Sequence, residues 1–210
     1  MHQTAPKTAA SDLRRHLDGV ERGLVVALYV FLLYRFAGAI SDNPLNILYL
    51  FTEGLVMLMV LCRRSTDQIS VAPRDWAVAF GGTFSSMMIM PGTPVAGAFG
   101  ISTACLLVGT SISLLSKIQL RRSFGLVAAN RGLKTEGVYA LVRHPMYFGY
   151  FLVQGGMLLI NFSAWNAAII AVWSSLQLLR IDAEESMLAR DSEYREHMQR
   201  VRYKLIPYLY

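Results

Sequence analysis

Residues 95–115 read VAGAFGISTACLLVGTSISLL and contain no charged side chain. An α-helix needs about 20 predominantly apolar residues to cross the hydrocarbon core of a bilayer. This stretch meets that length, so it predicts a membrane-spanning helix. The question for the rest of the chain is whether its other apolar stretches behave in the same way.

The composition places the chain among membrane proteins. Of its 210 residues, 54% are hydrophobic and 16% are charged, whereas charged residues make up about 25% of a typical soluble domain. The first, second and fourth apolar blocks are long enough to span a bilayer directly, and the other three would span as a hairpin or with flanking residues. The six blocks are residues 23–40, 45–62, 76–90, 95–115, 147–160 and 165–179.

The basic residues are confined to the two termini and to every second loop between these blocks. All of the 20 Lys and Arg residues except Arg35 lie before the first block, after the last block, or in loops 63–75 and 116–146. The loops between, which are residues 41–44, 91–94 and 161–164, contain none. Cytoplasmic loops carry the excess of Lys and Arg in membrane proteins. The pattern therefore predicts about six segments in the inner, cytoplasmic membrane, with both termini in the cytoplasm.

We therefore expect an all-α integral membrane protein with three parts. Residues 1–22 form a cytoplasmic N-terminal segment, and residues 23–115 form the N-terminal transmembrane helices. Residues 116–210 form a catalytic region, in which the last two blocks make a helical hairpin that precedes a C-terminal cytoplasmic helix. The net charge of +6 fits this topology and an affinity for anionic lipid, so we do not expect nucleic-acid binding.

A functional site is expected on the cytoplasmic side, because the outer loops are very short. Residues 141–150 read LVRHPMYFGY. Pro145 suits the first turn of a helix, where its missing N–H has no consequence. Arg143 and His144 would then lie at the N-terminal end of that helix, which is suited to binding an anion.

The second polar segment carries acidic residues with helical spacing. Ile181, Glu184, Glu185 and Leu188 fall on one face of a helix. The two carboxylates could receive a cation, so together with the basic pair before Pro145 they could hold a zwitterion. The alternatives are a solvated acidic face and an Arg143 that only anchors the chain to lipid phosphate.

A family resemblance rests on four stretches, which are GVYALVRHPMYFGY (137–150), RIDAEESML (180–188), EYREHMQRV (193–201) and LIP (205–207). Together they resemble the isoprenylcysteine carboxyl methyltransferase and phospholipid N-methyltransferase superfamily. The resemblance covers residues 116–208. It implies an integral-membrane enzyme that uses S-adenosylmethionine and transfers its methyl group to a lipophilic acceptor entering from the bilayer.

The resemblance also implies roles for individual residues. Arg143 and Glu185 would be catalytic, with Arg143 orienting the acceptor. Residues that would bind the cofactor are His144, Tyr147, Gly149, Glu184, Glu185, Tyr194 and Arg200. No metal is expected, and the oligomeric state is left open. The acceptor could be an isoprenylcysteine-like carboxylate, a phospholipid or a thiol.

Two other functions compete with this one. A membrane NADPH-dependent reductase of the steroid-reductase type has a similar HPxYxG element, but its His-rich, Trp-containing C-terminal stretch has no counterpart here. A small transporter or scaffold would instead distribute its polar groups along the helices.

Two charged residues lie within the predicted membrane blocks, where ionisable groups commonly mark functional sites. Arg35 is near the outer end of the first block, and Glu53 is midway along the second. We expect Glu53 either to pair with Arg35 as a structural strut or to line an acceptor cavity.

Overall fold

The computed structural model describes residues 7–42, 44–63, 70, 72–120, 123, 127, 133–207 and 209–210. Within these residues the fold is entirely helical, which confirms the all-α prediction. The elements are α1 (Lys7–Phe36), α2 (Ala39–Asp42), α3 (Asn46–Cys62), α4 (Pro73–Ser86), α5 (Phe99–Leu120), the 3-10 helix η2 (Gly137–Ala140), α6 (Pro145–Ile160), α7 (Ala164–Leu188) and α8 (Ser192–Arg200).

The helices follow the six apolar blocks, and α1, α5 and α7 extend beyond their blocks at the polar ends. α1 begins at Lys7, inside the segment that was predicted to precede the first block, while residues 1–6 lie outside the described residues. α7 runs beyond its apolar block to Leu188, so the acidic face predicted from the spacing is helical. Pro145 occupies the first turn of α6, as predicted.

The membrane topology is supported only in part. Among the described helices, α5 alone is long and apolar enough to cross a bilayer by length and composition. α3 and α6 are apolar but have 17 and 16 residues, and α4 has 14. The six-segment topology therefore stays a prediction.

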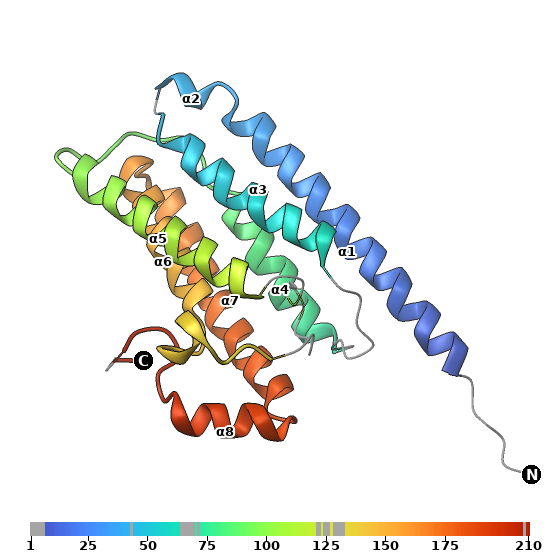
Figure 1. The fold of residues 1–210 in the computed structure, drawn as a ribbon. Helices are drawn as coiled ribbons and strands as arrows, with labels where there is room; N and C mark the ends of the chain where they lie inside the picture. Colours follow the sequence, from blue (N-terminus) through green and yellow to red (C-terminus); the bar gives the residue numbers. More distant parts are fainter. Residues whose placement is uncertain are drawn as a thin grey trace, which may run out of the picture.

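Two helix pairs form the centre of the bundle. α5 packs along α6, and α4 packs along α7, while α1 lies against α3 at the outer edge (Figure 1). α5 and α6 approach closely because glycines face each other: a Cβ atom added at Gly149 would lie 2.6 Å from the carbonyl oxygen of Gly109. Small residues at such a crossing allow the two backbones to approach.

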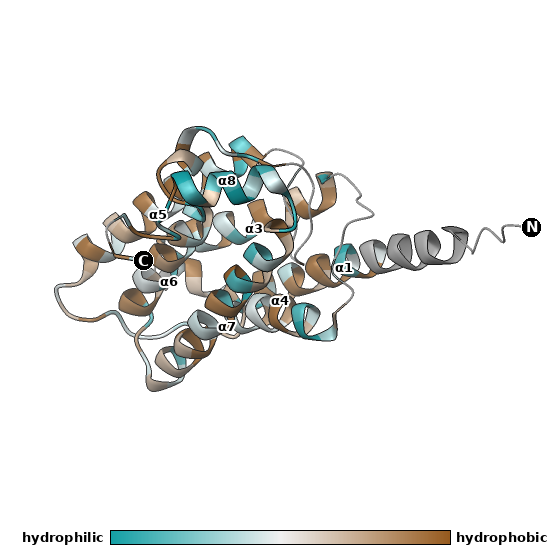
Figure 2. Cartoon of the chain, turned by 90° about the horizontal axis from the view of Figure 1, so that it is seen from below, coloured by the Kyte–Doolittle hydropathy of each residue, from teal (hydrophilic) through white to brown (hydrophobic). Residues whose placement is uncertain are grey.

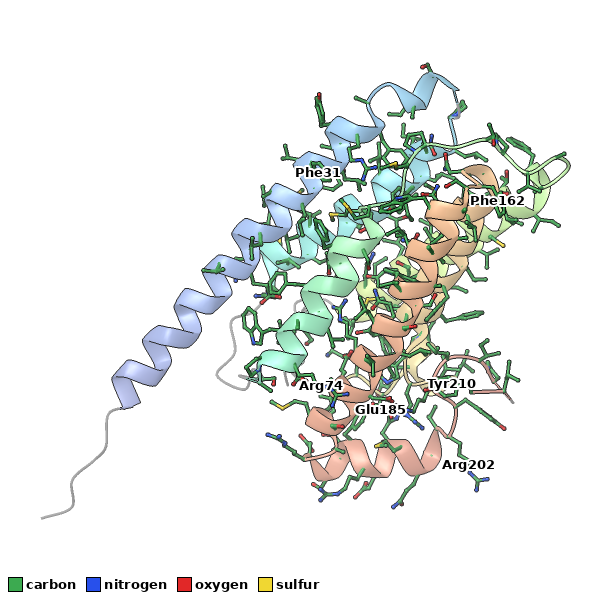
Figure 3. The ribbon with its side chains drawn as sticks, turned by 180° about the vertical axis from the view of Figure 1, so that it is seen from behind. Phe31, Arg74, Phe162, Glu185, Arg202 and Tyr210 are labelled. Carbon is green, nitrogen blue, oxygen red and sulfur yellow. The ribbon has the colours of Figure 1, made fainter. Side chains whose placement is uncertain are left out.

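The three loops predicted to face outward meet at one end of the bundle. The Asn161 side chain donates to Asn46 Oδ1 at 3.1 Å and accepts from the Gly92 backbone N–H at 3.1 Å. An isolated antiparallel bridge joins Thr93 to Phe162. Figure 3 shows Phe162 at this end and Glu185 at the other, so the loops lie far from the predicted site.

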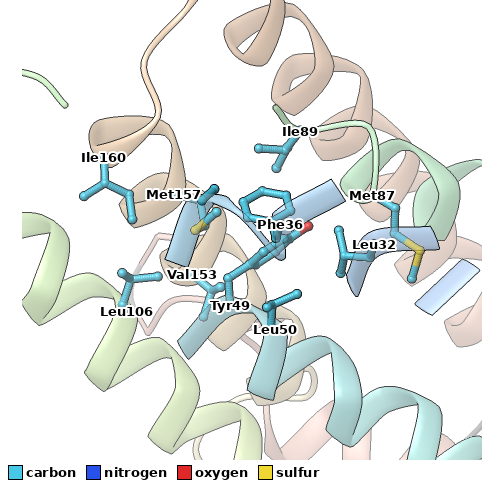
Figure 4. Close-up of a cluster of buried hydrophobic side chains, with 11 residues drawn as sticks. Leu32, Phe36, Tyr49, Leu50, Met87, Ile89, Leu106, Val153, Met157 and Ile160 are labelled. Carbon is cyan, nitrogen blue, oxygen red and sulfur yellow. The ribbon is translucent and has the colours of Figure 1, made fainter. Parts of the chain in front are cut away.

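A hydrophobic cluster fills the bundle between this end and its middle (Figure 4). Phe36 of α1, Tyr49 of α3, Leu106 of α5 and Met157 of α6 are all fully buried within it. The hydroxyl of Tyr49 donates to the Ser86 carbonyl, so this core tyrosine leaves no unsatisfied donor. The cluster fixes α1 and α3 against the helices that carry the predicted site.

Arg35 and Glu53 do not form the strut that was one of the two possibilities predicted for Glu53. The Arg35 guanidinium donates to the Met87 carbonyl at 2.9 Å and lies 5.5 Å from the centroid of the Phe31 ring. α1 and α3 are instead joined by a fully buried ion pair between Glu21 and Arg63. Arg35 therefore stabilises the outer end of the bundle, and it is not the partner of Glu53.

Candidate active site

The segment before α6 is held by the segment that follows α8. The backbone N–H groups of Arg143 and His144 donate to the carbonyls of Tyr203 and Lys204 at 3.0 and 2.8 Å. These residues directly precede Pro145, which can start a helix but offers no N–H of its own. The chain therefore brings the C-terminal stretch against the N-terminal end of α6.

Arg143 binds three groups at once. Its Nε donates to Glu185 Oε1 at 2.6 Å, and its NH1 donates to the carbonyls of Val201 and Arg202, each at 2.8 Å. A guanidinium offers five N–H donors in a fixed planar arrangement, which suits such a multiple contact. Arg143 thus joins α6, α7 and the segment after α8 into one unit.

Glu185 is buried at the centre of this unit. His144 Nε2 lies 3.1 Å from its Oε1, and Lys204 Nζ lies 3.4 Å from its Oε2. Burial alone would raise the pKa of the Glu185 carboxyl, but its hydrogen bonds with His144 and Arg143 outweigh burial and lower that pKa to about 2. Glu185 therefore remains ionised at any physiological pH, and its charge is already compensated within the protein.

Glu184 points to a different neighbour from Glu185. The hydroxyl of Tyr147 donates to Glu184 Oε2 at 2.9 Å, and the guanidinium carbon of Arg180 lies 5.6 Å from the centroid of the Tyr147 ring. Glu184 is half-buried. The two adjacent carboxylates therefore differ in role: Glu185 is enclosed by cations, while Glu184 faces an open space.

That space is a pocket with an empty volume of about 590 Å³, which we call the end pocket. The end pocket is lined from the start of α6, the end of α7 and α8, and these segments lie at the end of the bundle across which α8 runs (Figure 1). Its polar and aromatic lining includes Lys134, Tyr139, Tyr147, Glu184, Tyr194 and His197.

α8 contributes two buried side chains to the end pocket. The hydroxyl of Tyr194 has no hydrogen-bond partner, and burial, with the charges of Glu185 and Glu184, raises its pKa. Burial, followed by the nearby charge of Arg200, lowers the pKa of His197. A neutral imidazole and an unpaired phenol are both available to hydrogen-bond a ligand.

The predicted site residues are distributed unevenly in the structure. Six of them form the arrangement just described: Arg143, His144, Tyr147, Glu184, Glu185 and Tyr194. Gly149 instead packs against α5, and the side chain of Arg200 is exposed at the end of α8. Their cofactor-binding roles remain predictions, and the structure gives Gly149 a packing role.

His197 was not among the predicted site residues. It lies three residues after Tyr194, so both side chains share one face of α8, and their ring centroids are 5.9 Å apart. The three-residue spacing from Tyr194 was the feature of the sequence that could have identified His197 as a site residue.

Residues 101–190 match the model of the isoprenylcysteine carboxyl methyltransferase (ICMT) family. The resemblance predicted from the sequence is confirmed. The ICMT-like segment begins in α5 and ends just after α7, so it includes Arg143 and both glutamates, whereas α8 lies beyond it. No curated protein matches the chain.

A second pocket, which we call the polar cavity, lies between α3, α4, α6 and α7. Its empty volume is about 460 Å³, and Glu53 is part of its lining, together with Gln154 and Gln177. Lining a cavity was the second possibility considered for Glu53.

Lys117 was misplaced by the sequence interpretation. It was counted in a cytoplasmic loop because the apolar block ends at Leu115, but α5 continues to Leu120 and buries it. Its Nζ lies 4.9 Å from the centroid of the Tyr150 ring, so an aromatic face partly compensates the buried ammonium.

Proposed function

We propose that the protein is an integral-membrane methyltransferase that uses S-adenosylmethionine and methylates a lipophilic acceptor at the cytoplasmic end of the helix bundle. The observation that carries this proposal is the end pocket. Most of its lining belongs to the ICMT-like segment, and α8 adds Tyr194 and His197. The lining contains one carboxylate, Glu184, which accepts a hydrogen bond from Tyr147.

The residues of the end pocket fit such a cofactor. S-Adenosylmethionine carries an ammonium and a sulfonium, and it supplies an activated methyl group when bound. Glu184 can bind the ammonium through a charge-assisted hydrogen bond. The rings of Tyr139, Tyr147 and Tyr194 line the same pocket, and aromatic faces attract cations. The unpaired Tyr194 hydroxyl offers a further hydrogen bond.

The protein's part in the reaction is positioning. Methyl transfer from a sulfonium is an in-line displacement, and holding two reactants in the required geometry can lower a barrier by about 7–11 kcal/mol. Glu184 and Tyr147 would fix the donor side. Arg143 and Glu185 would act as positioning residues, because their contacts hold α6, α7 and the C-terminal stretch together.

This assignment modifies one expectation from the sequence. Arg143 was expected to orient the acceptor directly, but its Nε and NH1 are engaged by Glu185 and two carbonyls. We therefore assign the contact with a cationic ligand to Glu184 and the structural contact to Glu185.

The surface supports placement in a membrane. Large apolar side chains are exposed along the helices, for example Tyr34 at 83%, Phe99 at 65% and Ile101 at 64%. Figure 2 shows apolar residues along the bundle and hydrophilic residues on α8. Exposed apolar surface of this extent is typical of interaction with lipid or with another protein. We propose that the six predicted segments are membrane-embedded, with short helices accommodated by local thinning of the bilayer.

The proposal is tested by methyl transfer to lipid. The purified protein in detergent is incubated with methyl-labelled S-adenosylmethionine and a lipid extract, and the organic phase is assayed for label. We expect transfer by the wild type, strongly reduced transfer by Glu184→Gln, and unchanged transfer by Glu196→Gln, which alters an exposed residue of α8. If the label remains in the aqueous phase whichever lipid fraction is added, a lipophilic acceptor would be refuted.

A further inference from the structure

The chain after Lys204 closes into a turn of its own, which we call the tail turn (residues 205–207 and 209–210). Two of its backbone N–H groups, those of Leu205 and Ile206, donate to the Tyr210 carbonyl at 2.8 and 2.9 Å. Two more donate to the Ile206 carbonyl, each at 3.1 Å. The Lys204 Nζ atom also lies 5.3 Å from the centroid of the Tyr210 ring. The tail turn is therefore held in shape by its own contacts.

One side of the tail turn is fixed to the helix bundle. Leu205 is 6% exposed and packs in a hydrophobic cluster with Val60 of α3 and Met146 of α6. The residues just before the turn accept the two backbone hydrogen bonds from Arg143 and His144. The tail turn therefore lies beside the N-terminal end of α6, at the side of the bundle end that α8 crosses (Figures 1 and 3).

The other side of the tail turn exposes apolar side chains. Leu209 is 77% exposed, Tyr210 44% and Ile206 36%. Leu141, in the segment that leads into α6, is 69% exposed. Burial of apolar surface is favourable by about 25 cal/mol per Å², and clusters of exposed apolar side chains mark sites of interaction with lipid or protein. The tail turn is therefore a candidate interaction surface.

The chain that leads into the tail turn is basic. Arg200 and Arg202 are exposed, and Lys204 Nζ binds Asp182 Oδ1 at 2.7 Å, which compensates that acidic side chain. Anionic lipids of the cytoplasmic leaflet attract basic residues close to the membrane, and interfacial segments combine such residues with Leu and aromatic side chains. A lipid surface with anionic head groups therefore fits both the charges and the apolar side chains.

We infer that the tail turn is a membrane-interface anchor, in which Ile206, Leu209 and Tyr210 insert between lipids beside the start of α6. The basic residues before the turn then lie at the level of the anionic phosphates. The inference rests on the proposed function, because it takes the bundle to be embedded in a membrane. It also adds to that function: residues 203 and 204 bind the Arg143 segment, so the anchor holds the proposed active site at the bilayer surface.

A fluorophore at single cysteines tests the anchor. In a background with Cys62→Ser and Cys105→Ser, the nitrobenzoxadiazole dye is attached at Leu209→Cys, at Glu196→Cys on the exposed side of α8, or at Ile101→Cys on the exposed side of α5. Each protein is placed, one copy per disc, in bilayer nanodiscs of phosphatidylcholine and phosphatidylglycerol. Part of the phosphatidylcholine carries a nitroxide quencher near the top of one acyl chain.

Quenching should be strong at the tail turn and weak on α8. Interfacial segments bury their apolar side about 5–10 Å into the boundary between head groups and acyl chains, so we expect quenching at position 209 to be at least about threefold stronger than at position 196. Quenching at position 101 reports whether α5 is embedded, and it should be as strong as at position 209.

The three positions separate this inference from membrane placement. Quenching at position 101 but not at position 209, or equal quenching at positions 209 and 196, would overturn the anchor and leave the embedded bundle standing. Emission at position 209 that is blue-shifted but not quenched would overturn it as well, because protein would then cover the turn. Quenching at none of the positions would count against membrane placement itself, and the anchor would fall with it.

A charge placed in the tail turn provides a second test. Ile206→Asp should lower quenching at position 209 at least about twofold, because a carboxylate resists transfer out of water. Gln199→Asp, on the exposed surface of α8, should leave that quenching unchanged. Equal effects of the two substitutions would contradict the anchor.

Titration of S-adenosylmethionine into the same nanodiscs separates the anchor from the methyltransferase proposal. Quenching at position 209 in protein that does not bind the cofactor would support the anchor and count against the methyltransferase proposal. Cofactor binding without quenching at position 209 would overturn the anchor alone.

Discussion

At the scale of single residues, Arg143 and Glu185 stabilise the site by their contacts with each other and with the backbone. Both side chains are almost completely buried. Removing one partner of a buried ion pair leaves an uncompensated charge, which costs about 3–5 kcal/mol. The same contacts connect segments that are far apart in the sequence.

Arg143→Ala should therefore lower the thermal unfolding midpoint markedly, which can be measured by tryptophan fluorescence in detergent. Arg143→Lys should restore little of the loss, because an ammonium cannot reproduce the planar arrangement of guanidinium donors. Arg202→Ala is the matched control, since that side chain is exposed and its backbone carbonyl is retained. Equal effects of Arg143→Ala and Arg202→Ala would contradict this role.

Because the pKa of Glu185 is lowered by folding, the free energy of unfolding should decrease at acidic pH. Its pKa is about 2 in the folded protein, compared with an ordinary value of 4.5. As the pH falls from 4.5 toward 2, the unfolded chain binds a proton that the folded protein does not, so the free energy of unfolding decreases. We expect the stability difference between wild type and Glu185→Gln to be largest above pH 4.5 and to shrink toward pH 2. A difference that does not vary over this range would be evidence against the carboxylate's role.

At the scale of elements, the contact between α5 and α6 depends on glycine. A Cβ atom at Gly149 would lie 2.6 Å from a backbone oxygen and 2.8 Å from the backbone nitrogen of Ser113, whereas one at Gly155 would have no neighbour within 4 Å. The two glycines belong to one helix and differ only in what they face. They therefore form a matched pair.

Gly149→Ala should destabilise the protein by about 1–3 kcal/mol, the usual effect of overpacking. Gly155→Ala should be neutral or stabilising by up to about 1 kcal/mol, because alanine is the better helix former. Unfolding midpoints in detergent measure both. If Gly149→Ala abolished cofactor binding without changing stability, the cofactor-binding role predicted from the motif would be supported instead.

The helices themselves could be predicted because they follow the apolar blocks, and Pro145 marked the start of α6. The ends of α5 and α7 could not be placed from hydrophobicity alone, since both helices continue through polar residues. Lys117 was misplaced for that reason. Gly149 could not be separated from the cofactor motif, because its reason for being glycine is a contact with Gly109 on another helix.

At the scale of the whole molecule, the three short loops gather at one end and the proposed site lies at the other. The sequence predicted this separation through the positions of the basic residues. It could not predict that residues 203 and 204 bind the backbone of the Arg143 segment, because that contact joins distant parts of the chain. For the same reason, a cavity at Glu53 was only one of two possibilities, and its lining by Gln154 and Gln177 was not predicted.

Cysteine labelling tests the topology. In a background with Cys62→Ser and Cys105→Ser, Ala96→Cys lies in the loop between α4 and α5, and Ser192→Cys lies at the start of α8; both positions are exposed. A membrane-impermeant maleimide should label the first in intact cells and the second only after the membrane is permeabilised. Labelling of both from the same side would contradict the proposed arrangement.

The central claim is that the end pocket binds S-adenosylmethionine through Glu184. Calorimetric titration of the cofactor into the purified protein tests it most directly, with Glu184→Gln and the exposed control Glu196→Gln measured alongside. Loss of a charged hydrogen bond costs about 1.5–3 kcal/mol, so we predict saturable binding that is weakened at least tenfold by Glu184→Gln and unchanged by Glu196→Gln. Absence of binding to the folded wild type, or equal binding by all three proteins, would contradict the claim.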